Sequence, residues 1–154
     1  MKKLLAVMAA LLLLLTAAGC SSNATETFTF ENMTITVPKS YKMKEAEYDG
    51  FDYTLEGDNL VILFSRVPVA DIEAYGFDEE AVANIAYEGM DVKEKDGMTY
   101  GTYTYNNGEE TFYYTYGLFK DATYYWDVNL ACDEKDQTQL ADPMVTILSS
   151  VELK

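Results

Sequence analysis

The sequence predicts an α+β fold, in which one internal and one C-terminal helix pack on an antiparallel β-sheet. Three observations predict it. Alternating apolar and polar residues run from Met98 to Cys132, which is typical of strands joined by short turns. Apolar residues recur at helical spacing between Asp78 and Glu88. They do so again from Leu140 onward.

The first 19 residues have the pattern of a secretory signal peptide. Two lysines precede an uncharged run from Leu4 to Ala18, which is shorter than the roughly 20 apolar residues that span a bilayer. The small residues before Cys20 resemble a bacterial lipobox, although Ala17 stands where that motif usually has leucine. The resemblance implies that Cys20 receives a diacylglyceryl group and becomes the mature N-terminus. The alternative is an ordinary signal peptide that is cleaved near Ala18.

A lipid on Cys20 would anchor an exported protein at the extracytoplasmic face of the cell membrane. The lipid bilayer is then its first partner, because two acyl chains suffice for stable attachment. We expect residues 20–26 to form a short tether and residues 27–154 to form a single domain.

Charge and composition exclude several classes of function. Removal of the two signal-peptide lysines leaves nine basic and 26 acidic residues, a net charge of −17 that excludes nucleic acid as a partner. The absence of histidine removes imidazole zinc sites and histidine-activated nucleophiles. Cys132 has no disulfide partner if Cys20 is lipidated, so we expect it to be a buried apolar side chain. We expect no enzymatic activity and no cofactor.

The domain is expected to open with strands. Phe28 and Phe30 alternate with threonine ahead of a turn at residues 31–32, which predicts a hairpin that ends at Pro38. Residues 39–50 are charged and irregular and predict a loop. Two further strands are expected at residues 51–56 and 60–66, and the second is apolar on both faces and therefore central.

One internal helix is expected next. A helical turn is predicted near Ile72 and Tyr75. Asp78 is a good N-cap, and the two glutamates that follow it favour the positive end of the helix dipole. These signals predict a helix from about Asp78 to Glu88, followed by a short strand at residues 92–95.

A three-stranded meander is expected from Met98 to Cys132. Asn107-Gly108 is typical of a two-residue type I′ loop, which would pair Tyr105 with Glu110. We expect a three-residue loop around residue 121, because only an odd loop gathers the apolar side chains on one face. The buried face would then consist of Phe112, Tyr114, Tyr116, Leu118, Tyr124, Trp126, Val128 and Leu130.

The C-terminal segment carries one apolar helical stripe, at offsets of 4, 7, 8 and 11 from Leu140. Because proline is comfortable only near a helix start, we expect the main helix from about Pro143 to Ser149, and a helical turn before it is the alternative that stays open.

Several stretches together carry a family resemblance. They are the hairpin that leads into residues 36–38 (Thr-Val-Pro), the internal helix, residues 124–128 (Tyr-Tyr-Trp-Asp-Val) and residues 147–150 (Ile-Leu-Ser-Ser). In this order they resemble small bacterial lipoproteins of the PsbP-like fold. That fold is also found in the extrinsic photosystem protein and in a Ran-binding nuclear import factor. The resemblance implies a non-catalytic domain that binds a protein partner or supports a membrane complex.

The second face of the meander is the candidate partner-binding surface. In the expected register it mixes rings, hydroxyls and two polar acceptors, a composition suited to protein docking. The candidate residues are Tyr100, Tyr113, Tyr125, Asp127 and Asn129. The alternative is that a helix covers this face or that it is simply the solvated side of the sheet.

A small-ligand or calcium-binding lipoprotein is the alternative function. Asp49, Asp52, Glu56 and Asp58 surround a turn and offer oxygen ligands of the kind that calcium prefers. They lack EF-hand spacing, and we assign no metal site.

Overall fold

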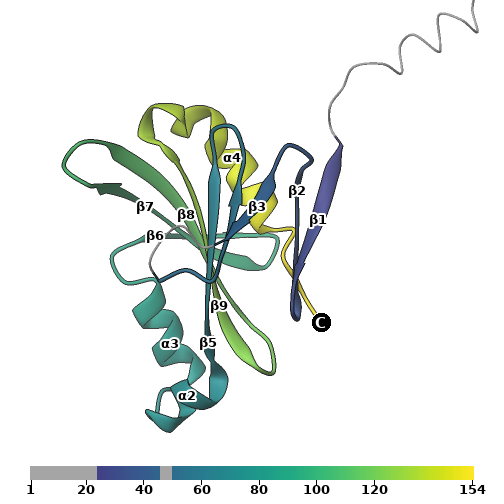
Figure 1. Ribbon diagram of the computed structural model, residues 1–154. Helices are drawn as coiled ribbons and strands as arrows, with labels where there is room; N and C mark the ends of the chain where they lie inside the picture. The colour runs from purple at the N-terminus through teal and green to yellow at the C-terminus, as the bar shows by residue number, and fades with distance from the viewer. Residues whose placement is uncertain (1–23, 46–49) are drawn as a thin grey trace, which may run out of the picture.

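Two antiparallel sheets organise the protein (Figure 1). The computed structural model describes residues 24–45 and 50–154, and the account below concerns these residues. The larger sheet has seven strands in the order β3-β4-β5-β9-β8-β7-β6, and the smaller has three in the order β1-β2-β10. The strands are β1 (Thr25–Phe30), β2 (Met33–Pro38), β3 (Lys42–Glu45), β4 (Tyr53–Glu56), β5 (Val61–Pro68), β6 (Asp91–Lys95), β7 (Met98–Asn106), β8 (Thr111–Lys120), β9 (Tyr124–Asp133) and β10 (Glu152–Leu153).

Helices lie against one face of the large sheet and at one of its ends. They are α2 (Val69–Ala74), α3 (Glu79–Ala86), the 3-10 turn η1 (Glu134–Asp136) and α4 (Gln137–Leu148). Helix α4 contacts β8 and β9 and also reaches β2 of the small sheet. Helices α2 and α3 extend beyond the end of β5, away from the loop between β7 and β8 (Figure 1). The predicted α+β fold with an internal and a C-terminal helix is confirmed.

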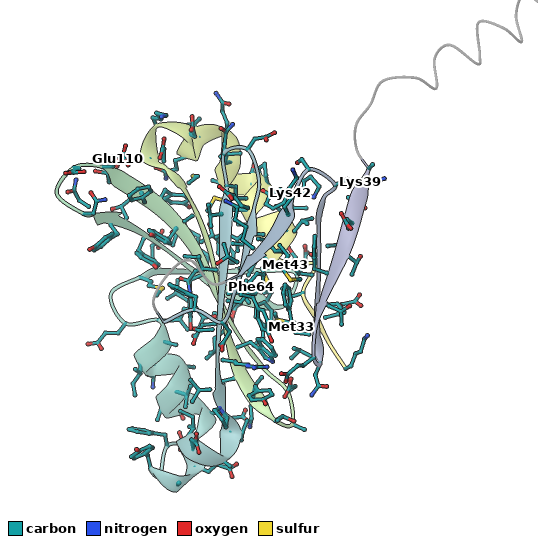
Figure 2. The ribbon with its side chains drawn as sticks, viewed as in Figure 1. Met33, Lys39, Lys42, Met43, Phe64 and Glu110 are labelled. Carbon is teal, nitrogen blue, oxygen red and sulfur yellow. The ribbon has the colours of Figure 1, made fainter. Side chains whose placement is uncertain are left out.

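The hydrophobic core fills the layer between the two sheets and α4. Met33 of the small sheet and Phe64 of the large sheet are both fully buried there (Figure 2). Trp126, Met144 and Leu148 are buried in the same cluster. The fold therefore buries the central part of one face of the large sheet, on β5, β8 and β9, and we call this face the core face.

Short turns set the register of the first hairpins as the sequence predicts. Strands β1 and β2 pair around Glu31, whose φ of 49° is the left-handed conformation that a tight hairpin needs. Strand β1 begins at Thr25, two residues before the expected start of the domain. The Asp96-Gly97 turn joins β6 to β7 with a positive φ at both residues, as in a type I′ turn.

The loop between β7 and β8 lies one residue later than predicted. Asn107 donates its backbone N–H to the carbonyl of Glu110, 3.1 Å away, so the two-residue loop is Gly108-Glu109. Gly108 has a φ of 98°, which is typical of the first central position of a type II′ turn. Asn107 precedes the loop, and its side-chain Oδ1 accepts hydrogen bonds from the N–H groups of Glu109 and Glu110. Tyr105 therefore pairs with Phe112 and not with Glu110.

The predicted three-residue loop between β8 and β9 is wrong. Asp121 and Tyr124 bracket a two-residue loop, in which the Asp121 carboxylate accepts from the N–H groups of Thr123 and Tyr124. Tyr116 consequently pairs with Asn129 rather than with Trp126. The apolar side chains of the meander therefore divide between the two faces of the sheet.

Two strands and the start of one helix also differ from the prediction. The expected loop at residues 39–50 contains strand β3, which pairs with β4. The C-terminal helix begins at Gln137, so Pro143 lies inside it. The buried stripe of Met144, Ile147 and Leu148 continues from Leu140 across Pro143, and the packing of this stripe outweighs the hydrogen bond that proline cannot donate. Strand β10 was not predicted.

The internal helix is confirmed. Helix α3 starts immediately after Asp78, whose carboxylate accepts a hydrogen bond from the N–H of Ala81 at 2.9 Å. The expected helical turn near Ile72 is α2. The expected central strand is β5, which lies between β4 and β9. Cys132 is buried as predicted, and burial raises the pKa of its thiol to about 11.

Candidate functional site

An aromatic cleft opens on the face of the large sheet opposite the core. Its volume is about 680 Å³, which lies within the range of small-molecule sites. Its walls come from the β4–β5 turn, from β5 and β9, and from β7 and β8 near their shared loop. Five aromatic rings line it, from Phe51, Tyr103, Tyr105, Phe112 and Tyr114. We call this site the aromatic cleft.

Alternation along the strands places these rings together. Tyr103 pairs with Tyr114 and Tyr105 pairs with Phe112, so all four side chains leave the sheet on the same side. The Tyr103 and Tyr114 rings stack with centroids 4.7 Å apart and planes 5° from parallel. Tyr105 is 56% exposed, so its ring is accessible from solvent. The cleft thus combines an ordered ring pair with an accessible ring.

A polar group lies among these rings. Asn129 is buried and lines the cleft, and its Oδ1 accepts a hydrogen bond from the Tyr103 hydroxyl at 3.2 Å. Burial, with a smaller effect from Tyr114, raises the pKa of Tyr103 to about 12. Tyr103 therefore keeps its proton and holds the Asn129 carbonyl in place well above neutral pH.

Four carboxylates line the cleft, and among the described lining residues there is no lysine or arginine. Glu56 forms an ion pair with Lys44, and Asp133 forms one with Lys135 at 2.6 Å. Asp58 and Asp136 have no such ion pair within residues 24–45 and 50–154. The site is therefore aromatic and negatively charged.

The five predicted partner-binding residues do not share a face. Tyr125, Asp127 and Asn129 lie on the cleft side, where Tyr116 donates a hydrogen bond to Asp127 and burial is the main cause that raises the pKa of Tyr116. Tyr113 belongs to the core cluster, and Tyr100 packs against it on the core face. Of the five, only Asn129 lines the aromatic cleft. The expected common face is wrong because the loop between β8 and β9 has an even length. Binding of a partner by these residues stays a prediction.

A second surface lies on the segment from α2 to α3. Tyr75 is 81% exposed, Ile85 60% and Phe77 43%. No residue of α3 is buried. The segment is held to the sheet after α3 by Tyr87, whose hydroxyl donates to the Thr99 carbonyl and accepts from the Leu118 N–H, both at 3.1 Å. We call Tyr75, Phe77 and Ile85 the α2–α3 surface.

Gly101 permits this attachment. A Cβ at that position would lie 2.6 Å from the Met90 sulfur and 3.1 Å from the Tyr87 ring. The Tyr87 ring also meets Tyr116 edge-on, with centroids 5.3 Å apart. The end of α3 is thus anchored while the α2–α3 surface itself stays open to solvent.

Of the acidic residues considered for calcium, Glu56 and Asp58 both line the aromatic cleft, whereas Asp52 does not. Asp52 accepts the backbone N–H of Arg66 at 3.0 Å, and Glu56 pairs with Lys44. Asp49 lies outside the described residues. Within the part of the chain that the structure describes, no three His, Cys, Asp or Glu side chains converge to hold a metal ion.

The predicted lipidation site, Cys20, also lies outside the described residues. None of the helices in the described part has both the length and the hydrophobicity to span a membrane.

Comparison with known proteins gives a structural match. No protein-family model and no curated protein sequence matches this chain. The solution structure of cyanobacterial PsbP (CyanoP) from Synechocystis sp. PCC 6803 superposes with a TM-score of 0.51 at 14% sequence identity. The match covers 89% of this chain and 96% of that one. At this identity the likeness concerns the fold alone, and the chain has a PsbP-like α+β fold.

Proposed function

We propose that the protein is an exported lipoprotein, anchored through a diacylglyceryl group on Cys20, that acts without catalysis as an accessory or adaptor for a protein partner. The signal peptide and its lipobox-like ending support the anchor. The PsbP-like fold supports a binding role by analogy, because the sequence resemblance implies domains that bind proteins or support membrane complexes.

The α2–α3 surface is the observation that carries the proposal. Two aromatic rings and an isoleucine are exposed on this segment, which contacts the sheet through α2 against β5, through the Glu79–Lys120 ion pair and through Tyr87. Aromatic residues dominate the energetics of protein interfaces, because they bury a large area at a modest entropic cost. Exposed rings on a projecting segment are therefore suited to insertion into a groove of a partner.

Acidic residues surround these apolar side chains. Asp71, Glu73 and Asp78 are exposed on the same segment, and so is Glu80. Negative charge disfavours contact with anionic lipid head groups. It favours a protein partner that presents an apolar groove with a basic rim, because complementary charges speed association and select partners.

The anchor would hold the start of β1 close to the membrane, whereas α2 and α3 lie at the far end of the domain from that point (Figure 1). Strand β1 begins at Thr25, five residues after Cys20. Five residues span at most about 18 Å when fully extended. The tether would therefore keep the domain at the membrane surface and direct the α2–α3 surface outward, toward the extracytoplasmic part of a membrane protein or another protein that reaches this surface.

Co-purification of the full-length protein from detergent-solubilised membranes tests the proposal. The variant Tyr75→Ser with Phe77→Ser should retain at least about tenfold less of the partner, since a single interface hot spot contributes about 2 kcal/mol or more and about 1.4 kcal/mol is tenfold in affinity. The matched control is Met43→Ser with Val92→Ser, which removes two apolar side chains that are each 49% exposed elsewhere. A protein captured equally by both variants would contradict docking through the α2–α3 surface.

A further inference from the structure

We infer that the aromatic cleft binds a small organic cation, an ammonium or guanidinium group attached to an apolar body. This site is separate from the α2–α3 surface and does not depend on the proposed partner. The cleft lies near the loop between β7 and β8, whereas α2 follows the other end of β5 (Figure 1).

The rings of the cleft favour a cation over a neutral ligand. An aromatic face carries partial negative charge, and a cation within about 6 Å of a tyrosine or phenylalanine ring is attracted to it. Five such rings line the site, and Tyr105 presents one that solvent reaches. The stacked pair of Tyr103 and Tyr114 fixes one wall, so a ligand meets preformed surfaces.

The carboxylates of the cleft also favour a positively charged ligand. Glu56, Asp58, Asp133 and Asp136 line the site, and two of these, Asp58 and Asp136, have no ion pair with a described residue. The whole chain has a net charge of −15, which raises the local concentration of cations. An anionic ligand would face both the carboxylates and the ring faces.

The apolar lining favours an organic cation over a metal ion. Leu63, Val61 and Ala131 line the cleft together with the rings. Calcium needs six to eight oxygen ligands, whereas no three acidic side chains converge among the described residues. Asn129 also lines the cleft, and its Oδ1, which accepts a hydrogen bond from Tyr103, keeps a second lone pair that can face a cation.

Calorimetric titration of the full-length protein in a nonionic detergent tests this inference with three probes that share one benzene ring. Benzyltrimethylammonium should bind about tenfold more tightly than neutral benzyl alcohol, since one desolvated cation–π contact accounts for about that ratio. Benzenesulfonate, the anionic probe, should bind more weakly than the alcohol. Equal affinity for the cation and the alcohol would overturn the inference, and so would the absence of cation binding.

Two variants locate the binding. Asp58→Asn with Asp136→Asn should weaken benzyltrimethylammonium binding several-fold, and so should Tyr105→Ala, whose side chain is exposed enough to be removed without unfolding the domain. The control is Asp71→Asn with Asp142→Asn, which makes the same change in net charge at exposed positions outside the cleft and should leave the affinity within twofold. If the control weakens binding as much as the cleft variant, the selectivity arises from net charge and the assignment to this cleft is wrong.

Discussion

Tyr113 and Tyr125 show how strongly the role of a residue depends on which face of the sheet it occupies. Tyr113 is 7% exposed on the core face, and Tyr125 is 5% exposed on the cleft face. Each single alanine variant should lower the free energy of unfolding by about 3 kcal/mol, as for other large buried rings. Urea denaturation measures this loss. The control Tyr75→Ala, at an exposed ring, should change stability by less than about 0.5 kcal/mol. Unchanged stability of both buried variants would contradict their placement.

Tyr103 should make the protein sensitive to alkali. Burial raises its pKa from 10.0 to about 12, so the folded protein keeps a proton that the unfolded chain releases. The contribution to stability is complete below pH 10 and is lost between about pH 10 and pH 12. Tyr103→Phe should therefore make the fall in unfolding free energy over that range shallower.

Denaturant titrations at several pH values between 9 and 12 would measure the slope for Tyr103→Phe. The slope should not vanish, because burial also raises the pKa of Tyr116. At pH 8 the variant should lose about 1 kcal/mol, since Asn129 no longer receives its hydrogen bond. Tyr105→Phe, at an exposed position, is the control and should leave the slope unchanged. An identical slope for the wild type and Tyr103→Phe would be inconsistent with the buried hydroxyl.

The residues of the aromatic cleft were predicted only in part, because the side chain of Asp121 determines a loop length that the sequence pattern did not predict. Asp121 accepts from the N–H groups of Thr123 and Tyr124 and also from the Trp126 indole. These bonds favour a two-residue loop, whereas the prediction assumed that only one face of the meander is buried. Asn129 was identified as a candidate, whereas Tyr114 was expected on the buried face of the meander and Tyr103 was not proposed for a site. The face that they share with Asn129 could have been found by testing both lengths of the loop between β8 and β9 against a sheet buried on both sides.

At the scale of single elements, the sequence predicted correctly those helices and turns that are determined by residues adjacent in the chain. The Asp78 cap and the glutamates after it gave α3, and a turn at residues 31–32 gave the first hairpin. Elements that depend on distant contacts were missed. Strand β10 forms only because the chain returns to pair with β2, and Lys154 donates its N–H to the Asn32 carbonyl at 2.8 Å.

Gly117 lets α4 approach β8 closely. A Cβ there would lie 2.8 Å from the Phe119 ring and 2.9 Å from a methyl group of Leu148. Gly117→Ala should therefore lower the unfolding free energy by about 1–3 kcal/mol through overpacking. Thermal or urea unfolding measures the effect.

A double-mutant cycle identifies the cause of the Gly117 effect. Leu148→Ala alone creates a cavity and should cost about 2–5 kcal/mol. Because it also removes the methyl group that meets the new Cβ, the double variant should be less destabilised than the sum of the two single changes. Strict additivity would show that the packing of α4 on β8 is not the reason for the glycine.

At the scale of the whole molecule, the two sheets and α4 enclose a single core. Ser150, just beyond α4, accepts the Thr36 N–H at 2.9 Å and donates to the Thr36 carbonyl at 3.0 Å. The end of α4 is thereby fixed to β2. Because β1 and β2 belong to this core, a lipid on Cys20 would hold the folded domain directly at the membrane rather than at the end of a long linker.

Replacement of Cys20 tests the anchor. Cys20→Ser should release the protein from the membrane fraction or leave it unprocessed, because the remaining sequence supplies no comparable lipid attachment. Fractionation with detergent-phase partitioning measures the change. Cys132→Ser is the control for the loss of a thiol and should leave the membrane association unaltered. Unchanged partitioning of a Cys20→Ser protein that is cleaved to the same size as the wild type would rule out lipidation at this residue.

Photo-crosslinking at position 75 tests the docking claim most directly. A benzophenone amino acid placed at Tyr75 of the full-length protein in its own membranes should give one discrete protein adduct, and the same residue at Ile85 should capture the same protein. The probe at Met43, which is also exposed but lies on β3, should not capture it. Adducts to the same protein at Met43 but not at Tyr75, or adducts to lipid alone, would contradict docking through the α2–α3 surface.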